Sequence, residues 1–328
     1  MQKFLLSLIL LGTGAATALA AERFAFAAIG CVPYARSPNS GENFARLIAE
    51  INRANPVFTV HLGDFKGSEE PCTDELFLRR RDEFNSFTGP LIYTPGDNEW
   101  TDSHYEKAGR RDPLERLARL REVFFAEERS LGQHPLALVT QRQDPQFAKF
   151  VENARWSHGG VLFATVHAVG SDNNDQPALP GAVAEFQERA AAAAAWIRAA
   201  FVEARATAAV GVVLLFQADP LGLDFGQPGV ARGFEQFLRV IADETRAWAK
   251  PVLLVHADQH RYRLDVGVQL LPDEAPLPNG TRLETFGDPN VHGVLVVVDP
   301  DSPQLFLCGP LIVPGNPLPL LPRPKKAP

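Results

Sequence analysis

Acidic, amide and histidine side chains follow several of the apolar runs in this sequence. In chain order they are Asp64, Asp97, Asn98, Glu99, Gln217, His256, Asp258 and His260. A Gly-Asp pair after a strand is more often a simple turn, but polar groups after four separate runs favour one shared site. Convergent oxygen and imidazole groups are typical of a divalent metal site.

Short apolar runs that alternate with helical patterns predict the elements that would position these side chains. Strands are predicted over 24–30, 57–62, 90–94, 160–168, 211–217, 251–256, 292–298 and 304–308. Helices are predicted over 41–54, 74–87, 113–128, 182–207 and 232–249. This alternation indicates βαβ units, in which ligands bind at the carboxyl ends of the strands. The last two strands have no helix between them, so we expect them to pair antiparallel.

The ends of the chain differ in composition from the rest. Residues 1–20 combine Lys3, an apolar stretch and an A-x-A cleavage pattern at 18–20, which predicts a signal peptide and a periplasmic or secreted protein. No later stretch is long enough to span a membrane. We expect one domain over 21–312 and an extended or disordered proline-rich tail over 313–328.

The charge of the chain excludes one class of partner. The 328 residues carry a net charge of −7, and no stripe of Lys and Arg is interleaved with aromatic residues. This argues against nucleic acid as the main partner. A small molecule that binds at the strand ends is the better expectation.

Read in order, "HLGDFKG", "YTPGDNEW", "LLFQADP" and "HADQH" resemble the motifs of the calcineurin-like metallophosphoesterases, which include purple acid phosphatases and related nucleases. Residues 24–125 look most like a bacterial exported subgroup of that family, through "YTPGDNEWTD" and "RDPLERLA". Residues 160–265 resemble the wider family more loosely. The resemblance implies an α/β four-layer sandwich, with two mixed β-sheets flanked by helices, and two metal ions bridged by one aspartate.

The resemblance assigns roles to the residues after the first three strands. Asp64 matches the bridging aspartate, and Asp97 stands where the family has a metal-binding Asn. Asn98 takes the place of the catalytic His, whereas Glu99 matches the supporting Glu. Cys31 occupies the position of the first-strand Asp, and this departure is the chain's own.

The remaining motifs complete two expected metal pockets. Gln217 stands at the position of a lone His, and Asp258 and His260 overlay the Gly-His-x-His motif. The first pocket would then hold Asp64 and His260, with Cys31 added only as a thiolate, and the second Asp64, Asp97, Gln217 and Asp258. Because the second set offers only oxygen donors, it favours hard ions. We expect one or two divalent ions per chain, Mn²⁺ or Mg²⁺ rather than Zn²⁺, with about one tightly held.

The expected function is hydrolysis of phosphate esters with reduced activity. Asn98 cannot donate a proton as the family's His would, so the proton must come from elsewhere, and His61, His104 and especially His256 are the candidates. The alternative is a non-catalytic exported binding protein that retains the fold and one metal pocket.

Three roles remain open for Cys31. It could form a disulfide with Cys72, act as a metal ligand, or be inert. Within the subgroup, a Cys is common where this chain has Ser103. The resemblance therefore suggests that a bridge from Cys72 has been relocated to Cys31, in a compartment where disulfides persist. Cys308 is expected to be an inert core residue.

Overall fold

The computed structural model describes residues 22–221 and 232–319. The predicted signal peptide and the end of the predicted tail lie outside the described residues. No helix within the described ranges is both long and apolar enough to cross a membrane.

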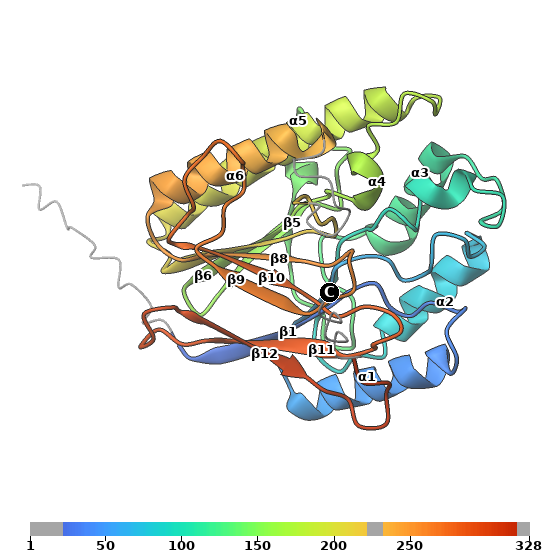
Figure 1. Ribbon diagram of the computed structural model, residues 1–328, viewed down its shortest axis with the longest axis horizontal. Helices are drawn as coiled ribbons and strands as arrows, with labels where there is room; N and C mark the ends of the chain where they lie inside the picture. Colours follow the sequence, from blue (N-terminus) through green and yellow to red (C-terminus); the bar gives the residue numbers. More distant parts are fainter. Residues whose placement is uncertain (1–21, 222–231, 320–328) are drawn as a thin grey trace, which may run out of the picture.

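A five-stranded mixed sheet contains the first three strands of the chain (Figure 1). Its strands are β1 (Phe24–Ile29), β2 (Thr59–His61), β3 (Leu91–Tyr93), β11 (Gly293–Val298) and β12 (Phe306–Leu311). The spatial order is β12-β11-β1-β2-β3, with β1, β2 and β3 parallel. β11 pairs antiparallel with both β1 and β12, which confirms the predicted pairing of the last two strands.

A seven-stranded mixed sheet faces the first one. Its strands are β4 (Val139–Thr140), β5 (Ala154–His158), β6 (Val161–Thr165), β7 (Gly211–Leu215), β8 (Val252–His256), β9 (Arg263–Val266) and β10 (Gly280–Glu284). They lie in the order β4-β5-β6-β7-β8-β10-β9, and β6, β7, β8 and β10 run parallel. The sequence did not predict β4, β5, β9 or β10, because these strands are short or carry polar residues.

Helices cover the outer faces of both sheets, which gives the four layers of the predicted sandwich. α1 (Ser40–Ala54), α2 (Asp74–Phe84) and α3 (Pro113–Phe124) lie beside the five-stranded sheet, and α5 (Ala182–Ala206) and α6 (Glu235–Trp248) cover the seven-stranded sheet (Figure 1). Shorter turns complete the set: α4 (Gly170–Asn173), η1 (Thr101–His104), η2 (Gln141–Gln143) and η3 (Arg232–Phe234).

Side chains of both sheets meet in a central apolar core. Phe26 and Val60 of the first sheet pack in one cluster with Phe163, Val213 and Leu253 of the second. Because β-strand side chains alternate between faces, the opposite faces of the same strands pack on the helices. This double burial explains why the strands read as continuous apolar runs.

The packed domain continues beyond the predicted boundary at residue 312. Val313 and Asn316 are buried. The Asn316 amide nitrogen donates to the carbonyl oxygens of Val291 at 2.7 Å and Asn43 at 2.9 Å. The start of the predicted proline-rich tail is therefore part of the fold.

Candidate metal centre

The predicted site residues lie on loops that leave the carboxyl ends of parallel strands in both sheets. Cys31 follows β1, Asp64 follows β2 and Asp97 follows β3. Gln217 and Asp258 follow β7 and β8. Since the two sheets present these ends side by side, residues far apart in the sequence meet at one place.

Two groups of potential ligand atoms form there, each within 4.8 Å of one another. Cys31, Asp64 and His260 make the first group, and Asp64, Asp97 and Asp258 make the second. Asp64 belongs to both, as expected for a bridging aspartate. We call these groups the first pocket and the second pocket.

The loops that carry these ligands are tightly fitted. A Cβ on Gly96 would lie 2.1 Å from Asp64 Oδ1, so only glycine allows the loop after β3 to approach Asp64. Left-handed backbone is found at four ligand positions, with φ of 51° at Cys31, 58° at Asp64, 82° at Asp258 and 63° at His260. Strained non-glycine backbone of this kind concentrates at functional sites.

The first pocket presents His260 in the form that metal sites require. Its Nδ1 lies 2.6 Å from the carbonyl oxygen of Asp288, so Nδ1 carries the hydrogen and Nε2 presents its lone pair to the first pocket. Burial lowers the pKa of His260 and keeps the ring neutral. The Tyr34 hydroxyl lies 3.2 Å from Nε2 and 3.3 Å from Asp64 Oδ2.

Cys31 lies inside the first pocket as a protonated thiol. Its Sγ is 3.5 Å from Asp64 Oδ2 and accepts the backbone N–H of Asp258 at 3.2 Å. Burial, followed by the charges of Asp64 and Asp258, raises the pKa of the thiol well above its ordinary value. The position suits a ligand, provided that a cation replaces the proton.

The expected disulfide between Cys31 and Cys72 is wrong in this structure. Both residues are buried free thiols. Cys72 Sγ donates to the carbonyl oxygen of Glu99 at 2.9 Å, whereas Cys31 Sγ contacts Asp64. The two thiols therefore have separate partners, although their strands are neighbours.

The second pocket holds Gln217 in an unexpected orientation. The backbone N–H of Gly170 donates to Gln217 Oε1 at 2.6 Å, and this fixes which end of the amide faces the carboxylates. Gln217 Nε2 donates to Asp64 Oδ2 and to Asp258 Oδ1, both at 3.1 Å. To act as the predicted oxygen ligand, the Gln217 amide would have to turn.

The carboxyl groups of the second pocket repel one another in a buried place. Burial, and then neighbouring acidic charges, raise the pKa values of Asp64 and Asp97 well above the ordinary range. Burial also raises the pKa of Asp258 to about 6. Asp97 Oδ1 is buried without a hydrogen-bond partner among the described atoms. A divalent cation would satisfy that oxygen and offset the repulsion, so the residues present fit a metal ion.

Residues behind the pockets hold Asp64 in place. Glu99 Oε1 accepts from the backbone N–H of Phe65 at 2.9 Å and from the Tyr93 hydroxyl at 3.2 Å. The backbone N–H of Asn98 donates to Asp64 Oδ1 at 3.2 Å. Glu99 thus holds the backbone directly after Asp64.

The structure does not support His256 as a proton source. Its Nδ1 lies 3.0 Å from the carbonyl oxygen of Ala257, and its Nε2 accepts from Arg282 Nε at 2.7 Å. Burial and the charge of Arg282 hold the pKa of His256 well below its ordinary value. His61 is also buried, with its Nε2 2.8 Å from the carbonyl oxygen of Val32, and burial lowers its pKa to about 3.

Sequence reasoning missed several residues of this centre, of which Tyr34, Lys66 and Ser171 are the most telling. Tyr34 contacts both Asp64 and His260, and the buried Lys66 donates to the carbonyl oxygen of Asn98 at 2.6 Å. Ser171 contacts Asp97 from the loop after β6. The strand predicted over 160–168 indicates that Ser171 lies near a strand end, but no motif indicates its contact with Asp97.

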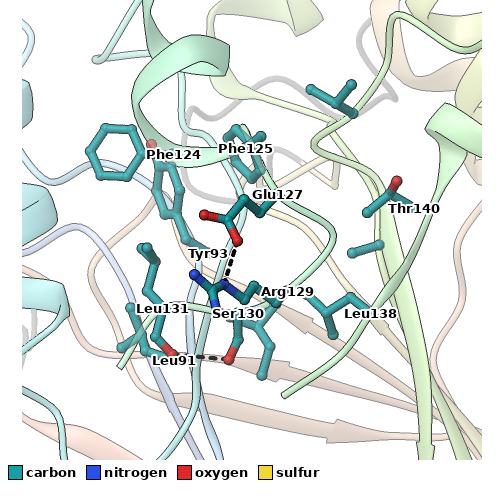
Figure 2. A pocket seen from close by; sticks show the side chains of 13 residues that line it. Leu91, Tyr93, Phe124, Phe125, Glu127, Arg129, Ser130, Leu131, Leu138 and Thr140 are labelled. Atoms are coloured by element: carbon teal, nitrogen blue, oxygen red, sulfur yellow. Dashed lines mark hydrogen bonds and ion pairs between the residues drawn. The ribbon is translucent and has the colours of Figure 1, made fainter. Parts of the chain in front are cut away.

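A separate pocket at the edge of the sandwich is too small to compete with this centre. It lies between β3 and the segment that leads to β4, with Leu91, Tyr93, Phe124 and Leu138 among its lining (Figure 2). Its cavity volume is about 20 Å³, which leaves room for no more than a water molecule.

Comparisons with known proteins agree with the fold. No model of a known protein family matches the sequence, and no curated protein sequence matches it. Among solved structures, a dimetal phosphatase from Danio rerio superposes with a TM-score of 0.50 and 12% identity, over 84% of this chain and 95% of that one. PhoD superposes with a TM-score of 0.53 and 11% identity, over 87% of this chain and 65% of PhoD.

At sequence identities of 11% and 12%, the similarity to these two structures concerns the fold alone. The chain has the fold of the calcineurin-like metallophosphoesterases, with two mixed sheets between helical layers. At the carboxyl ends of its strands it carries groups that could hold divalent metal ions.

Proposed function

We propose that this protein is a metal-dependent hydrolase of small phosphate esters. The observation that carries the proposal is the convergence of the buried Asp64 and Asp97 with the half-buried Asp258, three carboxyl groups with raised pKa values, within 4.8 Å of one another. An arrangement of this kind destabilises the fold unless a cation or protons neutralise it. The similarity of the fold to a dimetal phosphatase supports the same function.

Asp64, Asp97 and Asp258 would hold a divalent ion, and Cys31 and His260 would extend the site around Asp64. When bound, the ion would stabilise negative charge on the phosphoryl oxygens of an ester. The three carboxyl groups of the second pocket favour Mn²⁺ or Mg²⁺, whereas the thiol and imidazole of the first pocket suit softer ions. We propose about one tightly held Mn²⁺ or Mg²⁺ per chain.

The chain's own donors would orient the ester. Asn98 Nδ2 donates to the Tyr34 hydroxyl at 2.9 Å, so both polar groups border the first pocket. Asn98 has no proton to give to a leaving alkoxide, and His256 is engaged elsewhere. Esters with acidic leaving groups should therefore react faster than alkyl esters. We also propose that the protein acts in the periplasm or outside the cell, on the basis of residues 1–20 alone.

Hydrolysis of p-nitrophenyl phosphate and of its bis ester, measured with and without added Mn²⁺, tests the proposal. We expect Mn²⁺-dependent hydrolysis by the wild-type protein and a loss of about a hundredfold or more in Asp64→Asn, because even residues that only support ligands cost ten- to a hundredfold. Asp82→Asn is the matched control, since Asp82 lies exposed on α2.

Two outcomes would contradict the proposal. Equal hydrolysis by Asp64→Asn and the wild-type protein would place the reaction outside this centre. Tight Mn²⁺ binding without hydrolysis of either ester would instead favour a non-catalytic binding protein.

A further inference from the structure

Four consecutive residues after β6 have left-handed backbone although none is glycine. The φ angles are 51° at Ser171, 51° at Asp172, 55° at Asn173 and 61° at Asn174. A run of this kind is unfavourable for residues that carry a Cβ, and it persists only where the surroundings determine it strongly. We call residues 171–174, which overlap α4, the left-handed turn.

Arg189 of α5 holds the left-handed turn from one side. This buried side chain donates from Nη1 to Asn173 Oδ1 at 2.6 Å and from Nη2 to the Asn173 carbonyl oxygen at 2.8 Å. Gly233 holds it from the other side, where its backbone N–H donates to Asp172 Oδ1 at 3.0 Å. Contacts with α5 and η3 therefore hold Asp172 and Asn173 in this conformation.

The left-handed turn contacts Asp97 of the second pocket. Ser171 Oγ lies 2.9 Å from Asp97 Oδ2 and 2.9 Å from Asp102 Oδ1. A Cβ on the preceding residue, Gly170, would lie 2.7 Å from both carboxylate oxygens of Asp97. The turn thus brings a hydroxyl group into contact with the Asp97 carboxylate, and only glycine at position 170 leaves room for that carboxylate.

Ser171 satisfies only one of the two oxygens of Asp97. Oδ2 contacts the Ser171 hydroxyl, whereas Oδ1 is buried and has no partner among the described atoms. A hydroxyl has a single hydrogen, so it can donate to Asp97 or to Asp102 but not to both. When it donates to Asp97 Oδ2, the hydrogen bond restricts rotation of the Asp97 carboxylate and leaves Oδ1 for a ligand.

We propose that Ser171 is a positioning residue for Asp97, and that the strain of the left-handed turn is tolerated because it places this hydroxyl. The inference rests on the proposed function in one respect, since it takes Asp97 to be a metal ligand. Ser171 lies outside the motifs that identify Asp97, and its hydroxyl would fix how the Asp97 carboxylate is oriented.

Ser171→Gly tests whether the Ser171 hydroxyl positions Asp97 or only supports the fold. Glycine adopts a φ of 51° without strain, and this gain offsets part of the cost of leaving Asp97 Oδ2 without its donor, so the variant should still fold while it lacks the hydroxyl. We expect about tenfold weaker Mn²⁺ binding by titration calorimetry, the size of effect seen when residues that orient a ligand are lost. Ser171→Asn keeps a donor and tolerates left-handed backbone, so it should recover part of the affinity.

Ala208→Gly is the matched control, because Ala208 is exposed, has a φ of 53° and lies just beyond α5. It relieves the same kind of strain and should leave Mn²⁺ affinity unchanged. Unchanged affinity in Ser171→Gly would overturn the inference and leave the proposed function standing. Absence of Mn²⁺ binding by the wild-type protein would overturn both.

Discussion

Gln217 Nε2 donates to Asp64 Oδ2 at 3.1 Å, so an amide nitrogen lies against the carboxylate that both pockets share. The N–H of Gly170 sets this orientation by donating to the other end of the amide. The second pocket therefore contains a hydrogen-bond donor where the sequence predicts an oxygen ligand. A cation there has to replace that donor or bind beside it.

Gln217→Glu should make the stability of the protein depend on metal. The new carboxylate would still accept the N–H of Gly170, but its second oxygen would face Asp64 and Asp258 in place of a donor. Without metal we expect the unfolding free energy at pH 7 to fall by roughly 1–3 kcal/mol, the cost of an unsatisfied buried polar group. Urea unfolding with and without Mn²⁺ measures it.

Added Mn²⁺ should restore most of that loss in Gln217→Glu. Gln133→Glu, which changes an exposed residue, should change little under either condition. A loss in Gln217→Glu that Mn²⁺ leaves unaltered would mean that no cation reaches the second pocket.

Cys31→Asp should strengthen the first pocket. Aspartate tolerates the left-handed backbone at Cys31, where φ is 51°, and it offers a hard oxygen in place of a thiol that burial keeps protonated. We expect a severalfold rise in Mn²⁺-dependent hydrolysis and a second Mn²⁺ bound per chain. Cys308→Ser is the control outside the centre. A second ion without faster hydrolysis would locate the defect at Asn98.

Thiol mapping tests whether Cys31 and Cys72 are free thiols and not a disulfide. Protein recovered from an oxidising compartment should show all three cysteines of the sequence as free thiols after unfolding. In the native protein Cys31 and Cys72 should resist alkylation because they are buried, and burial raises the pKa of Cys72 to about 11. A peptide that contains Cys31 crosslinked to Cys72 would contradict the structure.

Glu284 should make the protein less stable as pH rises. Burial, and then the charge of Asp219, raise the pKa of Glu284 from 4.5 to about 8. The folded protein therefore binds a proton that the unfolded chain has lost between these two pH values. The contribution is fully present below about pH 4.5 and is lost as pH rises through 8, at up to about 1.4 kcal/mol per pH unit.

Glu284→Gln removes this titration, so its unfolding free energy should fall less steeply between pH 6 and pH 8. Urea unfolding across that range compares the two proteins. Parallel curves would show that Glu284 ionises normally in the folded state.

The predicted helices and the longer strands are close to the observed ones because apolar periodicity and buried runs are local signals. Strand β9 escaped prediction because its residues alternate between half-buried and exposed, and β4 because it has only two residues. The predicted end of the domain at residue 312 lies too early for another reason. Asn316 is held by backbone carbonyl groups that are distant in sequence, which a proline-rich composition does not reveal.

In the candidate metal centre, too, the sequence predicts some features and not others. Asp64, Asp97, Asp258 and His260 could be identified from motifs at strand ends, and the structure brings them together. The orientation of Gln217 and the contacts of Tyr34 and Ser171 depend on loops folded against one another, so no short motif carries them. His256 stands in the same motif as Asp258, yet its side chain belongs to β8 and packs with Arg282.

The number of Mn²⁺ ions bound per chain, measured by titration calorimetry on metal-free protein, tests the central claim most directly. The account predicts about one tightly bound Mn²⁺ in the wild-type protein, with affinity lost in Asp64→Asn and kept in Asp82→Asn. Zn²⁺ should bind less tightly than Mn²⁺. No binding of either ion, or two tightly bound zinc ions, would contradict the account.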